Sequence, residues 1–137
     1  MSSIKDVERQ RAKFAYKCVE DVINQKQAEL SEYKSYVKKI PMMILINGLA
    51  PTFAFILSKA KNKNAYYFVY RNISSWLESE DARIQKQGKE DLMVFILAQN
   101  SQNYRVLSND ILALFSWIKR LADGMIEDKT ENEIKSE

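Results

Sequence analysis

Histidine is absent from this sequence of 137 residues, which also has one cysteine, two prolines and three glycines. Without histidine there can be no Ser-His or Cys-His nucleophile pair, no imidazole general base and no imidazole metal ligand. The single cysteine, Cys18, excludes a disulfide framework within the chain. So few glycines and prolines leave little turn chemistry for a β-rich fold. We therefore expect an all-α protein that is not an enzyme and holds no metal or cofactor.

Charge is unevenly distributed between the body of the chain and its C-terminal end. Residues 1–124 contain 19 basic and 13 acidic side chains, whereas residues 125–137 contain 2 and 5, so the body is +6 and the end is −3. A basic body suits a protein that contacts a polyanion, although a charge this small does not demand one. The length fits a single domain, expected over residues 1–124, and the acidic tail 125–137 is expected to be disordered. The N-terminal residues lack the pattern of a secretory signal, which favours a cytoplasmic protein.

The longest apolar segment runs from Ile40 to Ser58 and contains no charged residue. A membrane span needs about 20 apolar residues, so this segment is long enough to raise the question. Its centre argues against lipid, because Asn47, Gly48 and Pro51 lie there and polar groups are most costly in the middle of a bilayer. We favour a buried central helix with Pro41 in its first turn and with a bend or interruption that Gly48 and Pro51 predict near its middle.

Apolar residues recur every three or four positions elsewhere in the chain, which predicts further helices. They are expected from the N-terminus to about Ala28, in a short stretch ending near Lys39, after an Asn64 cap, and from a Ser108 cap to Gly124 after a turn at residues 101–107. The apolar run Leu92–Ala98 is compatible with a buried helix or a buried strand, and we favour the helix. The aromatic residues after Asn64 could stack on nucleic acid, but their helical spacing favours a core position. With the central apolar helix, these stretches predict a compact single-domain bundle of about five to six helices.

Nine of the 21 basic residues stand out, as one isolated position and three groups. Arg11 interrupts the apolar stripe of the first helix, and we expect a structural role for it. The groups are Arg9, Lys13 and Lys17 on one face of the first helix, Lys59, Lys61 and Lys63 after the apolar segment, and Lys119 and Arg120 in the last helix. For the first group the alternative is an ordinary solvated face that nearby acids partly neutralise.

Short pieces of sequence follow one another in an order typical of a known family. They are Arg11-Ala12, Tyr33 and Tyr36, Pro41-Met42-Met43-Ile44, Asn47-Gly48-Leu49, Ala54-Phe55, Ser58-Lys59, Trp76-Leu77, Tyr104-Arg105, Leu112-Ala113-Leu114 and Trp117-Ile118-Lys119-Arg120. In their order and spacing over about residues 9–124, they resemble the small α-helical subunit of type III-B CRISPR effector complexes, the Cmr complex. Pro51 departs from the family pattern, which expects an ordinary helix residue there.

This resemblance implies a non-catalytic structural subunit of an RNA-guided ribonucleoprotein complex in antiviral defence. Several copies would stack as a minor filament and help to hold the guide-target RNA duplex, while other subunits carry out cleavage. The implied partners are other Cmr subunits, further copies of this chain, and crRNA and target RNA through phosphate contacts, with no membrane. A small helical membrane-associated or scaffold protein unrelated to nucleic acid is the alternative.

Two sets of candidate residues follow. The eight residues of the three basic groups are candidates for contacts with the RNA backbone, without sequence readout. Trp117 lies at the flank of the last helix's apolar stripe and is a candidate interface residue, with a position at the edge of the core as the alternative.

Overall fold

The computed structural model describes residues 4–25 and 29–127, and these residues form six α-helices and no strand. The helices are α1 (Ile4–Ile23), α2 (Leu30–Asn47), α3 (Leu49–Lys59), α4 (Ala65–Glu78), α5 (Leu92–Leu97) and α6 (Ser101–Met125). The expectation of an all-α bundle with five to six helices is confirmed. The predicted tail lies outside the described residues from position 128 onward, whereas Ile126 is only 4% exposed and belongs to the core.

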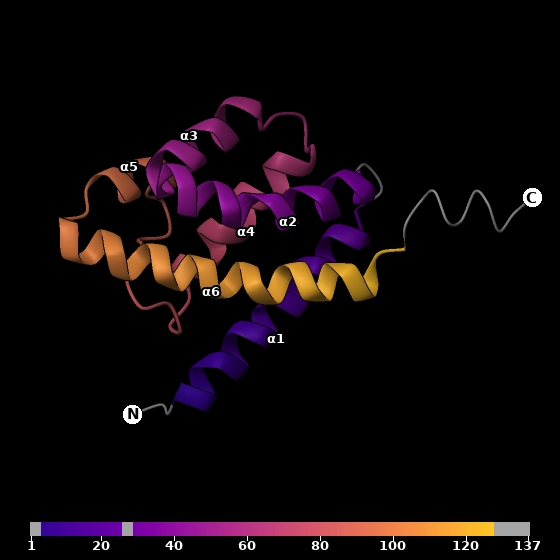
Figure 1. Ribbon diagram of the computed structural model, residues 1–137, viewed down its shortest axis with the longest axis horizontal. Coiled ribbons are helices and arrows are strands. Elements are labelled where there is room, and N and C mark those ends of the chain that lie inside the picture. The colour runs from indigo at the N-terminus through magenta and orange to yellow at the C-terminus, as the bar shows by residue number, and fades with distance from the viewer. Residues whose placement is uncertain (1–3, 26–28, 128–137) are drawn as a thin grey trace, which may run out of the picture.

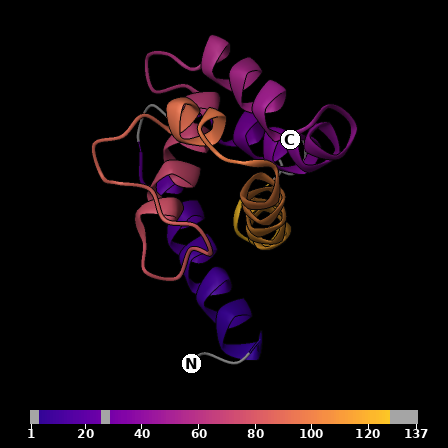
Figure 2. The same ribbon diagram turned by 90° about the vertical axis from the view of Figure 1, so that its left-hand side faces the viewer.

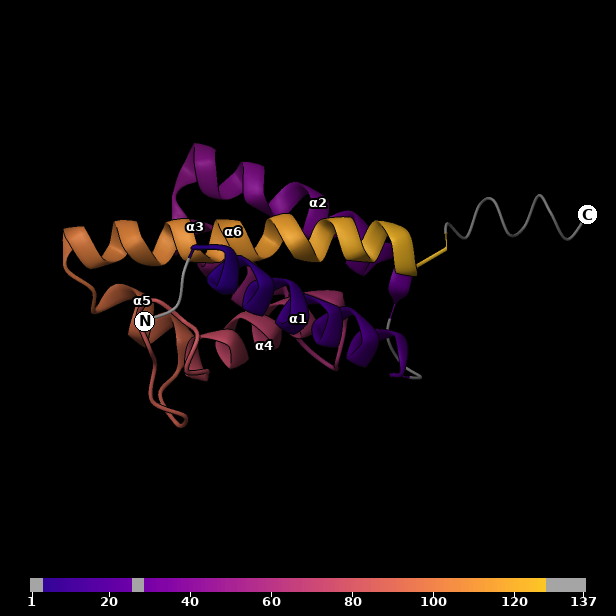
Figure 3. The same ribbon diagram turned by 90° about the horizontal axis from the view of Figure 1, so that it is seen from below.

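Helix α6 runs the length of the molecule, and the other helices are arranged around it (Figure 1). It packs against α1, which crosses it, and against α2, which runs alongside it (Figure 3). Helices α3 and α4 pack against each other and against α2, and α5 packs against α3. The core between them contains large aromatic side chains that are fully buried, among them Tyr33, Phe53, Trp76 and Phe115.

The apolar segment is divided between two helices, with the interruption at Gly48. The φ of Gly48 is +95° and its ψ is 162°, a conformation that residues other than glycine rarely adopt. Its N–H closes α2 by donating to the carbonyl of Ile44 at 2.8 Å, and its carbonyl accepts from the hydroxyl of Thr52 in α3 at 2.8 Å. The predicted interruption is therefore real.

The expected start of the central helix at Pro41 is wrong, because α2 begins eleven residues earlier, at Leu30. Its buried positions, Tyr33, Val37, Ile40 and Ile44, continue one stripe through the polar and the apolar halves. The short second helix and the first half of the apolar segment are thus one element with Pro41 inside it.

The apolar segment is buried on one side only. Ile44, Leu49, Phe53 and Ile56 face the core, whereas Ile46 is 72% exposed. Within residues 4–25 and 29–127, no helix is both long and apolar enough to cross a membrane.

Two other helix boundaries differ from the sequence prediction. Helix α1 ends at Ile23 instead of about Ala28, although residues 26–28 lie outside the described part of the chain. Helix α6 begins at Ser101, because the side chain of Asn100 caps it by accepting from the N–H of Asn103 at 2.8 Å. Ser108 is therefore inside α6, where its hydroxyl donates to the carbonyl of Tyr104 at 2.8 Å, and residues 101–107 are helix instead of turn.

The Asn64 cap is confirmed, since its side chain accepts from the N–H of Tyr67 at 2.9 Å.

Candidate functional site

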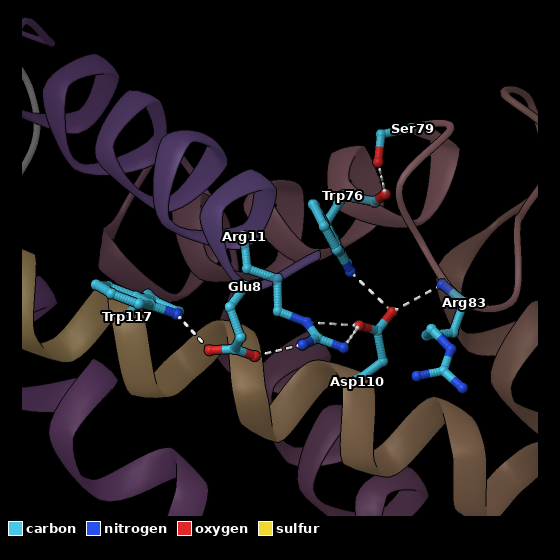
Figure 4. Close-up of polar contacts among 7 residues, drawn as sticks. All are labelled: Glu8, Arg11, Trp76, Ser79, Arg83, Asp110 and Trp117. Atoms are coloured by element: carbon cyan, nitrogen blue, oxygen red, sulfur yellow. Dashed lines mark hydrogen bonds and ion pairs between the residues drawn. The ribbon is translucent and has the colours of Figure 1, made fainter. Parts of the chain in front are cut away.

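A buried polar network joins α1, α4, α6 and the segment that follows α4 (Figure 4). Arg11 is 7% exposed, and its Nε and Nη2 donate to Oδ1 of Asp110 at 3.0 and 2.9 Å. The other oxygen of Asp110, Oδ2, accepts from the indole N–H of Trp76 at 3.0 Å and from the backbone N–H of Arg83 at 3.1 Å. The structural role expected for Arg11 is confirmed.

Glu8 extends this network to Trp117. Its Oε1 accepts from Nη1 of Arg11 at 2.5 Å, and its Oε2 accepts from the indole N–H of Trp117 at 3.0 Å. The hydrogen bond from Trp117 lowers the pKa of Glu8 most, partial burial opposes this, and Arg11 lowers it further. Trp117 is half-buried, and its hydrogen bond to Glu8 connects α6 with α1, as Figure 4 shows. Its side chain therefore already has a partner within the chain. Its role as an interface residue stays a prediction.

Asp110 is a residue that the sequence analysis missed. It is 1% exposed and lies between Leu107 and Ile111 on the buried face of α6. The sequence did contain a signal for this ion pair. An acidic residue occupies a core position in the apolar stripe of the last helix, and an arginine occupies a core position in the first helix. Because the network holds α1 and α6 together, it fixes where the basic residues of these helices lie.

The first basic group is exposed along α1, as predicted, but acidic side chains lie close to it. Arg9 forms an ion pair with Asp6. Lys13 and Lys17 line a surface hollow together with Glu20 and Asp81. The two acids offset the two lysines there, which weakens the attraction of this face for a polyanion.

The second basic group, Lys59, Lys61 and Lys63, is exposed at the end of α3 and in the turn before α4. The side chain of Asn64 holds this turn in place. Its amide donates to the carbonyl of Lys59 at 2.8 Å, and its oxygen accepts from the N–H of Lys61 at 3.3 Å. Lys59 thus ends α3, and Lys61 and Lys63 lie in a turn that the side chain of Asn64 stabilises.

The third basic group gains a member that the sequence did not reveal. Lys119 and Arg120 of α6 line a surface hollow with Lys38 of α2 and with Asp123. Asp123 is engaged by Lys38 at 2.8 Å and by Lys34 at 3.7 Å, and its pairing with Lys38, then Lys34, lowers its pKa. Neither Lys119 nor Arg120 forms an ion pair with any residue of the described part of the chain.

We call Lys38, Lys119 and Arg120 the basic cluster. It brings positive charge from two helices that pack side by side, and a single carboxylate accompanies it. Such a hollow can accept a phosphate group through charge without reading a base. Among the residues that the structure describes, no three acidic or cysteine side chains gather in a way that could hold a metal ion.

Comparison with known proteins connects this fold to one family. The family model described as CRISPR-associated protein (Cas_Cmr5) matches residues 7–125. The X-ray structure of a CRISPR-associated Cmr5 family protein from Thermus thermophilus superposes with a TM-score of 0.71, covering 93% of this chain and 100% of that chain at 24% sequence identity. At that identity the likeness shows a shared fold, and the family match covers most of the chain.

Proposed function

Because this chain belongs to the Cmr5 family of CRISPR-associated proteins, and so is a subunit of a Cmr complex in CRISPR defence, we propose that it serves there as a non-catalytic structural subunit. Several copies stack as a minor filament of a type III-B complex. The stack helps to hold the guide-target RNA duplex through contacts with its phosphates, and other subunits carry out cleavage.

The observation that carries the RNA part of this proposal is the basic cluster. A duplex whose sequence is read by base pairing needs only backbone contacts from the protein that holds it. Lys38, Lys119 and Arg120 provide such contacts from two helices, and Lys119 and Arg120 have no ion pair within the described residues that would have to break first. Successive copies in a stack repeat the cluster, so that weak contacts add along the duplex.

The three basic groups differ in how well they suit this role. The face with Arg9, Lys13 and Lys17 carries acids beside each charge. The turn with Lys59 and its neighbours is exposed and without a paired acid in the described chain, and it forms a second candidate surface. We rank the basic cluster first, because its charges come from two helices and converge on one hollow.

The test is the affinity of assembled complexes for target RNA as a function of salt. Replacing Lys38, Lys119 and Arg120 by alanine should weaken binding at low salt and make the salt dependence shallower, by about 0.7 in log-log slope per lost phosphate contact on a single strand and about 0.9 on a duplex. The loss should be similar for unrelated guide and target pairs, because no base is read. Cleavage by the other subunits should persist once target is bound.

The matched control is the alanine variant of Arg9, Lys13 and Lys17, which removes the same number of exposed charges from α1. It should change affinity and slope less than the basic-cluster variant does. Complexes must contain equal numbers of each subunit for the comparison. Wild-type affinity and slope in the basic-cluster variant would contradict the assignment, and wild-type values in both variants would leave a subunit that contacts only protein through these faces.

A further inference from the structure

Five large apolar side chains form two strips on the surface. The α2 strip consists of Met42, Leu45 and Ile46, which are 58%, 67% and 72% exposed and recur at the spacing of one helix face. The α5 strip consists of Val94 and Leu97, which are 58% and 67% exposed and lie three residues apart. Single exposed apolar residues are ordinary, but neighbouring ones on one helix face mark a surface that another protein covers.

The helix segments that carry the two strips, which are α5 and the C-terminal part of α2, lie at the same end of the molecule and on different sides of it. Figure 2, which looks onto that end, shows α5 on one side and the end of α2 on the other, with α6 lower in the view between them. The view from below in Figure 3 shows the same order. Each helix packs its other face on the core, where Ile44 of α2 and Ile96 of α5 are buried. The strips therefore cannot cover each other within one copy of the chain.

We propose that the α2 strip of one copy packs against the α5 strip of the next copy in the stack. The inference rests on the proposed function, because it assigns surfaces to the stacking that this function requires. A contact between two different surfaces of identical chains is heterologous, and it continues from copy to copy when the rotation does not close. Each interior copy then has both strips covered, whereas a foreign protein on one strip would leave the other exposed to water.

The size of the strips sets the conditions under which the contact forms. A stable interface buries about 800 Å² on each partner, more than two or three side chains a side can supply. The free protein therefore stays monomeric, and copies stack when neighbouring subunits hold them close, which raises their effective concentration.

The same face of α2 connects this contact with the basic cluster. Lys38 precedes Met42 by one helical turn and Leu45 by two. Stacking through the α2 strip therefore places Lys38 of each copy next to the junction with its neighbour. The basic clusters of successive copies then repeat along the stack.

Cysteine cross-linking tests the pairing directly. A chain with both Ile46→Cys and Leu97→Cys, treated with a short bis-maleimide in the assembled complex, should give a ladder of covalent dimers and longer products. Both positions are well exposed, so the fold should tolerate the changes. The native thiol does not compete, because Cys18 is 4% exposed and burial raises its pKa to about 12.

The single variants decide the geometry of the contact. Ile46→Cys alone and Leu97→Cys alone should give no cross-linked product, and complexes built from a mixture of the two should give dimers and nothing longer. Dimers from Ile46→Cys alone would mean that two α2 strips meet, which would overturn the proposal. The matched control pairs Ile46→Cys with Leu57→Cys, since Leu57 is an exposed apolar residue of α3 outside both strips and should give no ladder.

The number of copies in each complex, measured by native mass spectrometry, separates two kinds of failure. Several copies without a ladder from the Ile46→Cys, Leu97→Cys chain would overturn the pairing of the strips and leave the stacking in place. A single copy in the wild-type complex would overturn the stacking itself and with it the proposed function.

Discussion

At the scale of single residues, Asp110 fixes how the first and last helices meet. It accepts bonds from Arg11, from Trp76 and from the backbone of Arg83, so its buried charge is well satisfied. The structural role of Arg11 could be predicted, because an arginine in an apolar stripe needs a special environment. Its partner could not, since helical periodicity describes each helix alone and Asp110 is 99 positions away in the sequence.

Arg11→Leu should destabilise the protein strongly. The change leaves the carboxylate of Asp110 buried without its countercharge, and breaking a buried pair in this way costs about 3–5 kcal/mol. Arg9→Leu is the matched control, because Arg9 lies two positions earlier on α1 in an exposed pair with Asp6 and should cost less than about 1 kcal/mol. Urea unfolding of both variants measures the free energies.

A double variant examines whether Arg11 acts through Asp110. Adding Asp110→Asn to Arg11→Leu removes the uncompensated charge while leaving an acceptor for Trp76 or Arg83. The combined cost should therefore be smaller than the sum of the two single costs. Strict additivity would show that Arg11 stabilises the fold in some other way.

At the scale of elements, the sequence predicted that the apolar segment is interrupted, but it did not predict the contacts that hold the break between α2 and α3. Gly48 and Pro51 in an apolar run predict an interruption, and the structure has one at Gly48. The contact that completes it comes from far along the chain, since the hydroxyl of Tyr104 on α6 accepts from the N–H of Ala50 at 2.8 Å. The start of α2 at Leu30 was missed because polar residues fill its outer face before Pro41.

Gly48→Ala should destabilise the protein through its backbone. A Cβ would have space, at 3.5 Å from the hydroxyl of Tyr104 and 3.6 Å from Cδ of Pro51, but the φ of +95° is unfavourable for any L residue. Residues held in this glycine-only region cost about 1–3 kcal/mol. The midpoint of thermal or urea unfolding should fall accordingly.

Gly124→Ala is the control, and we expect it to raise the stability of the protein where Gly48→Ala lowers it. Gly124 lies in α6 with no positive φ, and nothing lies within 4 Å of an added Cβ. Alanine there should stabilise the protein by about 0.4–1 kcal/mol, because it restricts the unfolded chain and favours helix. If Gly48→Ala matched the stability of Gly124→Ala, the conformation at the break would not be a constraint on the fold.

At the scale of the whole molecule, helical periodicity predicted the class of fold but not which apolar surfaces stay bare. The uncharged segment suggested burial on all sides, yet its exposed side forms the α2 strip, with Ile46 72% exposed. The apolar content of a segment indicates how much of its surface should be buried. Which side chains are buried, and against which helix, depends on how the helices pack. For the same reason, the sequence predicted only part of the basic cluster. Lys119 and Arg120 are neighbours in one helix, whereas Lys38 lies beside them only because α2 packs on α6.

The buried side chain of Tyr33 makes the stability of the whole fold depend on pH in the alkaline range. Tyr33 is 0% exposed, its hydroxyl donates to Oδ1 of Asn72 at 2.7 Å, and burial raises its pKa well above the usual value. A group whose pKa is higher in the folded state contributes stability that is fully present below its unfolded pKa, about 10 for tyrosine, and that is lost as pH rises. The unfolded chain should therefore gain about 2 kcal/mol from ionisation of this one residue by about pH 11.5.

Tyr33→Phe isolates this contribution from that of every other titrating group, because lysines and the remaining tyrosines titrate in both proteins. At about pH 8 the variant should be less stable by about 1–2 kcal/mol, since it loses the hydrogen bond and leaves Oδ1 of Asn72 unpaired in the core. Between about pH 8 and 11.5 the difference should shift in favour of phenylalanine, by at most about 2 kcal/mol, because only the wild-type chain can release the proton of Tyr33 on unfolding. Urea unfolding of both proteins across this range measures the difference, and a constant difference would mean that Tyr33 ionises as readily in the folded core as in the unfolded chain.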